Sequence, residues 1–132
     1  MTKDGLSDIG LLRKVGQLVM PRLDFRGSQP MILARQLVRD FGVGGFIIFG
    51  GDREQVKEAT AELQSISKIP LFFSCDAERG VGQIVSDMSV FPFNMSLGAS
   101  RDTGLAYRLG AFIAEEMRSL GMNMLFAPVV DV

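Results

Sequence analysis

Short continuous runs of apolar residues alternate along this chain with longer segments in which apolar residues recur at helical spacing. The runs cover residues 17–23, 45–49, 71–73 and 124–130. Runs this short and this apolar are typical of strands covered on both faces in a parallel sheet. Pro21 and Pro128 have no N–H to donate, so the first run is expected at a sheet edge or with a broken ladder, and the last is weakened.

The segments with helical spacing lie around and between these runs and are closed by helix-capping residues. They predict helices over residues 7–15, 30–41, 52–66 and 102–120. Ser7, Asp52 and Asp102 are the expected N-caps, whereas Gly42 and Gly121 are the expected stops. Residues 76–101 show no strong period, and a connection of this length in a compact domain is usually functional.

The alternation of strands and helices predicts parallel strands joined by helical crossovers. Two α/β architectures fit this order: a small open doubly wound sheet, or the first half of an eight-unit barrel, which usually needs about 250 residues. An open sheet normally ends with a helix over its last strand, but here the chain stops at Val132. The sequence therefore favours an incomplete half barrel.

Composition is that of a globular domain and narrows the possible partners. The chain has 132 residues, 47% of them hydrophobic and 22% charged, and a net charge of −1. Its Lys and Arg residues are scattered, so neither nucleic acid nor a membrane is an expected partner. The N-terminus lacks a signal-like apolar core, and the single cysteine, Cys75, excludes an internal disulfide, so we expect a cytoplasmic protein.

The chain offers little to a metal or a cofactor. It contains no histidine, which excludes histidine metal sites and histidine acid–base chemistry within these residues. Cys75 is expected to be a buried small hydrophobe, and five methionines are expected in the core, at positions 88, 95, 117, 122 and 124. Gly80 and Gly82 lack the third glycine of a dinucleotide fingerprint, so no cofactor is expected.

The strongest candidate for chemistry follows the third apolar run. Asp76, Glu78 and Arg79 stand where a strand opens into a loop, which is where α/β enzymes place functional residues. The alternative is a solvated turn whose acidic residues only cap backbone or face water. Glu115 and Glu116, on the last helix, are expected on a solvated face.

A succession of motifs resembles the N-terminal domain of family 3 glycoside hydrolases. The motifs are GQLVM at 16–20, GGFIIF at 44–49, DAERG at 76–80, FP at 91–92, MSLGA at 95–99 and FAPVVDV at 126–132. The resemblance implies a TIM-like (β/α)8 barrel. Residues 1–132 would then be its N-terminal part, holding the first four βα units and truncated after the fourth strand.

The resemblance implies a retaining, exo-acting glycoside hydrolase that releases β-linked glucose or N-acetylglucosamine. Such enzymes use two groups about 5 Å apart, a nucleophile and an acid–base. In the family, the nucleophilic aspartate, a Lys-His sugar-binding pair and the acid–base histidine of the glucosaminidase branch lie beyond the position of Val132. No catalytic residue is therefore expected here, and the chain alone is expected to be inactive. Its expected partners are a carbohydrate substrate and either the missing C-terminal half of the barrel or further copies of the chain.

Three residues are expected to bind substrate. Asp76 matches the family aspartate that accepts hydrogen bonds from hydroxyls of the terminal sugar. Glu78 is expected to support that contact and to pair with Arg79, and Asp131 matches an aspartate after the Ala-Pro motif, where it either contacts substrate or caps the strand. Ile84 stands where the family often has an arginine, which leaves the sugar specificity open. A doubly wound binding module and a truncated, non-catalytic product are the alternatives.

Overall fold

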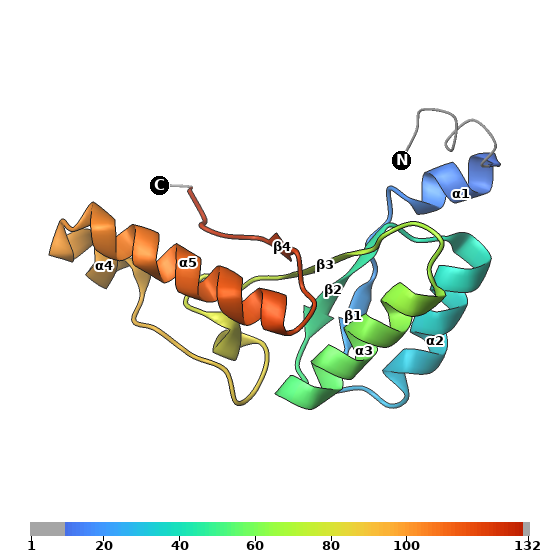
Figure 1. The fold of residues 1–132 in the computed structure, drawn as a ribbon, viewed down its shortest axis with the longest axis horizontal. Coiled ribbons are helices and arrows are strands. Elements are labelled where there is room, and N and C mark those ends of the chain that lie inside the picture. The colour runs from blue at the N-terminus through green and yellow to red at the C-terminus, as the bar shows by residue number, and fades with distance from the viewer. Residues whose placement is uncertain (1–9, 131–132) are drawn as a thin grey trace.

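Four short parallel strands form one sheet (Figure 1). The computed structural model of the protein describes residues 10–130. The strands are β1 (Arg22–Asp24), β2 (Gly45–Phe49), β3 (Phe72–Cys75) and β4 (Met124–Leu125). They lie in the order β1-β2-β3-β4, so each pairs with its neighbour in sequence. A (β/α)8 barrel has this sequential order, whereas a doubly wound sheet reverses its order at a switch point.

Helices fill the connections between the strands, and together they confirm the half barrel and exclude the doubly wound alternative. In chain order the helical elements are α1 (Leu11–Gly16), α2 (Pro30–Gln36) with a π-helical turn (Leu37–Phe41), α3 (Arg53–Ile66), a 3-10 turn (Val81–Gln83), α4 (Asn94–Ser100) and α5 (Thr103–Ser119). In Figure 1, α2 and α3 lie side by side against the sheet, and α4 with the first turns of α5 extends past its end.

The sheet has one covered face and one open face. Alternate residues point to opposite faces, so Phe46 of β2 and Phe73 of β3 share the face covered by α2 and α3, where both are buried. Their rings stack with centroids 6.2 Å apart. Phe72 points to the opposite face and is 51% exposed. We call this less covered side the lumen face; its strand residues are Arg22, Asp24, Ile47, Phe49, Phe72, Ser74 and Met124, of which Ser74 is fully buried.

The first strand is shorter than the predicted run 17–23 and lies at its end, and the last strand is shorter than the predicted run 124–130. β1 begins at Arg22 because the residues before it close the end of α1, where Val19 N–H donates to Gly16 O at 2.9 Å. It lies at an edge of the described sheet, as Pro21 predicts. β4 ends at Leu125; Phe126 N–H still donates to Cys75 O at 3.1 Å, but Pro128 has no N–H with which to extend the ladder.

The caps predicted at Asp52, Asp102, Gly42 and Gly121 are confirmed, whereas α1 begins later than predicted, at Leu11 with Gly10 as its N-cap. The Asp52 side chain accepts a hydrogen bond from the N–H of Gln55, and the Gln55 side chain accepts one from the N–H of Asp52, so the two form a complete capping box. Asp102 caps α5. Gly42 and Gly121 both take the left-handed conformation expected just after a helix. Ser7 lies outside the described residues.

Three sequence predictions for the second half of the chain are wrong. The connection between β3 and β4 is not irregular throughout, because it contains a 3-10 turn and α4. α4 buries none of its residues, so it leaves no apolar period in the sequence. Met95, on this helix, is 85% exposed instead of lying in the core, whereas Met117 and Met122 are buried as expected.

The third wrong prediction concerns Glu116 on α5. It is half-buried rather than on a solvated face, and its Oε1 accepts a hydrogen bond from Ser89 N–H at 3.1 Å. The bond ties the β3–α4 connection to α5. Among residues 10–130, no helix combines the length and apolarity needed to cross a bilayer.

Candidate functional site

Asp76 follows β3 directly at the carboxyl end of the sheet. Its side chain has the same alternation as Phe72 and Ser74, which belong to the lumen face. Asp76 is exposed, and no N–H or hydroxyl within residues 10–130 donates a hydrogen bond to its carboxylate. A carboxylate in this position is available to accept hydrogen bonds from a ligand on the lumen side.

The loop after Asp76 is closed on itself by backbone hydrogen bonds. Gly82 N–H donates to Ser89 O at 2.9 Å, and Phe91 N–H donates to Arg79 O at 2.7 Å. Gly80 has φ +102°, and a Cβ on it would lie 2.4 Å from Ser89 O, so the loop needs glycine there. Asp76 is therefore followed by an ordered turn.

Glu78 does not form the predicted ion pair with Arg79. The Arg79 guanidinium instead stacks on the Phe93 ring, with its central carbon 4.1 Å from the ring centroid. Glu78 is half-buried and lines an open cavity of about 610 Å³ bordered by the β3–α4 connection, α4, α5, β4 and the residues after it. Asp76 does not line this cavity.

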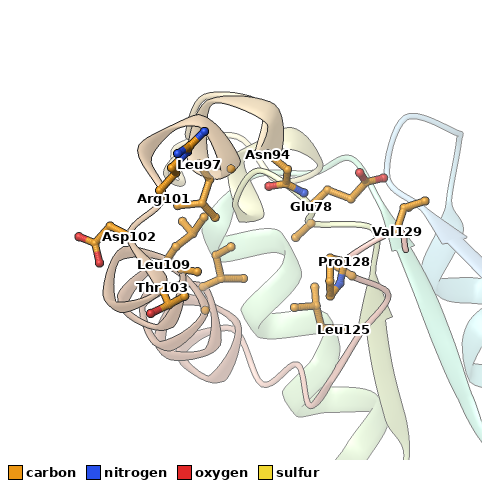
Figure 2. A pocket seen from close by; sticks show the side chains of 16 residues that line it. Glu78, Asn94, Leu97, Arg101, Asp102, Thr103, Leu109, Leu125, Pro128 and Val129 are labelled. Atoms are coloured by element: carbon orange, nitrogen blue, oxygen red, sulfur yellow. The ribbon is translucent and has the colours of Figure 1, made fainter. Parts of the chain in front are cut away.

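That cavity has a mainly apolar wall and polar groups at its margin. Figure 2 shows Glu78 and Val129 on one side of it and Arg101 and Asp102 on the other. Asp102 is already engaged, because it accepts from Leu105 N–H at 3.0 Å as the cap of α5. The structure thus places Asp76 on the lumen face and Glu78 in a separate cavity. Asp131, the third predicted residue, lies outside the described residues.

Sequence reasoning missed a charged cluster at the end of β1. The Asp24 carboxylate accepts hydrogen bonds from Arg26 Nε at 2.8 Å, from Arg26 Nη2 at 3.1 Å and from Arg26 backbone N at 3.1 Å. Arg22 Nη2 donates to the same carboxylate. The side-chain hydrogen bonds from Arg26 lower the pKa of Asp24 from its ordinary value of 3.8 to about 2. The spacing Arg-x-Asp-x-Arg was the available signal, because strand residues two apart share a face.

This cluster and Asp76 belong to the same face of the sheet, with β2 between them. Asp24 pairs in register with Phe49, and extending the β2–β3 register two residues beyond Ile47 places Asp76 next to Phe49 on the other side. With strands about 5 Å apart, Asp24 and Asp76 are separated by about 10 Å. The Arg22 guanidinium covers Phe49, 4.5 Å from the ring centroid.

Cys75 and Ile84, two further residues considered in the sequence, contribute no reactive or polar group to the site. Cys75 is fully buried, and burial raises its pKa to about 12, so it is the small hydrophobe that the sequence predicts. Ile84 packs against the core and supplies no polar contact. Residues 10–130 contain no cluster of three or more His, Cys, Asp or Glu side chains placed to share a metal ion.

Comparison with known proteins decides the family. Residues 11–132 match the family described as "Glycosyl hydrolase family 3 N terminal domain". The chain belongs to glycoside hydrolase family 3. The sequential half barrel and the ordered motifs agree with this membership, which confirms the resemblance seen in the sequence.

Curated relatives from this family carry glycosidase names. The chain is 33% identical over 127 residues to "Beta-N-acetylglucosaminidase/beta-glucosidase" of Cellulomonas fimi, covering 96% of this chain and 22% of that protein. It is 29% identical over 131 residues to "Periplasmic beta-glucosidase" of Salmonella typhimurium, covering 98% and 16%. The chain therefore spans about a fifth of the length of these family 3 relatives.

Solved structures of similar proteins share the fold. "Beta-glucoside phosphorylase BglX bound to 2FGlc" superposes with a TM-score of 0.85 at 26% identity, covering 100% of this chain and 25% of that chain. NagZ from Neisseria gonorrhoeae superposes with a TM-score of 0.62 at 26% identity, covering 86% and 37%. In both cases this family 3 chain matches only part of a larger molecule.

Proposed function

We propose that this chain forms the first half of the barrel domain of a retaining, exo-acting β-glycosidase. Its substrates are β-glucosides or β-N-acetylglucosaminides, in line with the two activities for which the Cellulomonas fimi relative is named. In this proposal the domain continues past the fourth strand, and its remaining strands cover the lumen face, on which Phe72 is exposed in this chain. A barrel closed in this way buries both exposed strand edges.

The position of Asp76 carries this proposal. Asp76 stands at the carboxyl end of β3, on the lumen face and without a donor among the described residues. Two adjacent sugar hydroxyls both donate to its ionised carboxylate and fix the terminal sugar in the barrel mouth. Charge-assisted bonds of this kind are about twice as strong as neutral ones.

Glu78 and Asp131 have supporting roles in the proposal. Glu78, in the β3–α4 connection, contacts the substrate from the cavity that it lines. Asp131 follows the Ala127-Pro128 pair and supplies a further acceptor after β4. Neither residue is a nucleophile or an acid–base here.

The groups that break the bond come from the rest of the barrel. Retaining hydrolysis needs a carboxylate nucleophile and a proton donor about 5 Å apart. The chain has no histidine, and we expect the nucleophile to come from the part of the domain that follows the fourth strand. The 132-residue chain alone is therefore inactive, and its partner is the C-terminal half of the barrel or, in its absence, another copy of the chain.

Phosphorolysis is the second candidate reaction, because one well-superposing structure bears the name of a β-glucoside phosphorylase. In that reaction phosphate replaces water as the acceptor of the glycosyl group. The substrate sugar and the role of Asp76 stay the same.

We also propose that the protein is cytoplasmic. A single buried cysteine fits a reducing compartment, although the Salmonella typhimurium relative is named periplasmic. Cell fractionation with an antibody against the chain tests this point, and recovery in the periplasmic fraction contradicts it.

One assay tests the reaction. The longest natural gene product that contains this chain is supplied with chromogenic β-glucoside and β-N-acetylglucosaminide, with and without phosphate. Release of the free sugar supports hydrolysis, and release of the sugar 1-phosphate supports phosphorolysis. The 132-residue chain, purified from a host lacking such enzymes, should release neither. Absence of turnover from the longer product on both substrates contradicts the proposed function.

A further inference from the structure

Arg22, the first residue of β1, and Arg26, two residues past its end, have more hydrogen-bonding capacity than Asp24 uses. The two oxygens of Asp24 receive four donors, which saturates their lone pairs. Each guanidinium has five N–H groups. Most of the guanidinium N–H groups of Arg22 and Arg26 therefore have no acceptor among residues 10–130. Asp24 thus holds the arginines in place and leaves them able to bind something else.

The cluster carries an excess of positive charge. Two guanidinium groups face one carboxylate, and the lowered pKa of Asp24 keeps that carboxylate ionised at neutral pH. The next acidic side chain along this edge of the sheet is Asp76, about 10 Å away, which is about one Debye length at physiological salt.

The Phe49 ring limits how the arginines can move. Arg22 lies 4.5 Å and Arg26 lies 5.9 Å from the centroid of this ring, so both guanidinium groups rest against the same aromatic side chain. Stacking and the Asp24 hydrogen bonds together fix two forked donors before any ligand arrives. A site arranged in advance loses less side-chain entropy on binding.

We propose that Arg22 and Arg26 form a subsite for a small oxyanion on the lumen face, beside Asp76. Guanidinium forks match the planar or tetrahedral oxygens of a carboxylate or a phosphate, which they bind through paired hydrogen bonds. The oxyanion is the carboxylate of an acidic sugar or free inorganic phosphate. Closing a barrel over this face would remove water from the arginines, which increases their need for such an acceptor.

Direct binding measurements test the subsite without relying on turnover. The 132-residue chain is titrated by calorimetry at constant ionic strength with inorganic phosphate, glucuronate and glucose. Phosphate or glucuronate should bind with a Kd on the order of 1 mM, and glucose should not displace either. Binding of phosphate alone identifies free phosphate as the ligand, whereas binding of glucuronate alone identifies an acidic sugar.

Variants locate the binding. Arg22→Gln and Arg26→Gln should each raise the Kd about tenfold, because each removes a charge-assisted pair of bonds. Arg118→Gln removes the same charge from an exposed position at the end of α5 and should leave the Kd within about twofold. Arg22→Lys and Arg26→Lys keep the charge but lose the fork, so they should also weaken binding.

A second measurement, urea unfolding with and without the oxyanion, tests the subsite even if the chain or a variant is only partly folded. A ligand bound only by the folded state raises the midpoint of urea unfolding, or increases the helical signal of a partly folded chain. The subsite is disproved if neither oxyanion binds or stabilises the unsubstituted chain, or if the Arg22 and Arg26 variants bind as well as Arg118→Gln. Failure of the glycosidase assay would not affect either measurement.

Discussion

Asn123 and Phe73 exchange two hydrogen bonds although they are 50 residues apart in sequence. Phe73 N–H donates to Asn123 Oδ1 at 2.9 Å, and Asn123 N–H donates to Phe73 O at 3.0 Å. The Asn123 amide also donates from Nδ2 to Leu71 O at 3.0 Å. One side chain thereby substitutes for ladder bonds where β4 begins, which matters because β4 itself is only two residues long.

Asn123→Ala should therefore destabilise the fold. It leaves Phe73 N–H and Leu71 O without side-chain partners, which should lower the free energy of unfolding by about 1–3 kcal/mol. Urea denaturation followed by circular dichroism measures the change. Asn94→Ala removes an exposed asparagine that makes no such bonds and serves as the control. Equal stability of the two variants would contradict this function of Asn123.

Substitution of Gly80 tests the loop after Asp76. Gly80→Ala forces a side chain onto a φ of +102° and against Ser89 O, which should cost about 1–3 kcal/mol from the backbone conformation alone. Gly98→Ala is the matched control, because a Cβ at Gly98 in α4 meets no atom within 4 Å. Alanine is favoured over glycine in a helix, so the control should be stabilised by about 0.5–1 kcal/mol. A Gly80 variant as stable as the unsubstituted chain would show that the loop can rearrange.

The Asp24 cluster predicts a pH dependence below neutrality. In the folded state the pKa of the Asp24 carboxyl is lowered from 3.8 to about 2, and the side-chain hydrogen bonds from Arg26 are the largest cause. The ionised carboxylate therefore stabilises the fold above the unfolded pKa, and this contribution is lost as the pH falls from about 4 towards 2. NMR titration of the Asp24 carboxyl carbon should give a midpoint near 2. A midpoint near 3.8 would mean that Arg22 and Arg26 do not stabilise the ionised form of Asp24 in solution.

The open lumen face predicts self-association of the isolated chain. Phe72 is half-exposed there, and β1 and β4 each leave one edge unpaired within the described sheet. Unpaired edges and apolar patches of this kind promote pairing between copies. Light scattering should give an average mass that rises with concentration. A monodisperse monomer with a cooperative melting transition would show instead that this half barrel is stable by itself.

Local patterns were sufficient to predict most of the fold. The run at 45–49 and the cap at Asp52 predicted β2 and α3, because burial and capping are recorded in adjacent residues. α4 escaped prediction because it buries no residue, and β4 was overestimated because apolar residues continue past the point where its ladder ends. An exposed helix leaves no apolar period in its sequence, and the end of a strand depends on where its partner strand stops pairing with it.

The candidate site was only partly predictable. Asp76 could be placed because a charged residue followed an apolar run. The separation of Glu78 from Asp76 could not, because it depends on the closed loop and on Arg79 stacking against Phe93. The alternation of strand residues indicates that Arg22, Asp24 and Arg26 lie on one face. The sequence alone did not reveal this cluster, because it did not show that β1 extends only from Arg22 to Asp24.

Asp76 provides the most direct test of the proposed site. In the longest natural product that contains the chain, Asp76→Ala should impair sugar recognition while leaving the melting temperature nearly unchanged. The residue is exposed and makes no described hydrogen bond, so core packing does not depend on it. Each hydrogen bond to a charged group is worth roughly 1.5–3 kcal/mol. Losing two should lower kcat/KM by about 10²–10⁴, allowing for non-additivity.

The control for this experiment is Asp40→Ala, which removes an exposed carboxylate from the π-helical turn after α2. It should leave both kcat/KM and melting temperature within the error of the measurement. If contacts to Asp76 tighten as the sugar ring distorts, the Asp76 variant should lose kcat as well as affinity, because only bonds stronger in the transition state accelerate the reaction. A kcat/KM equal to that of Asp40→Ala would make Asp76 a turn residue and remove it from the site.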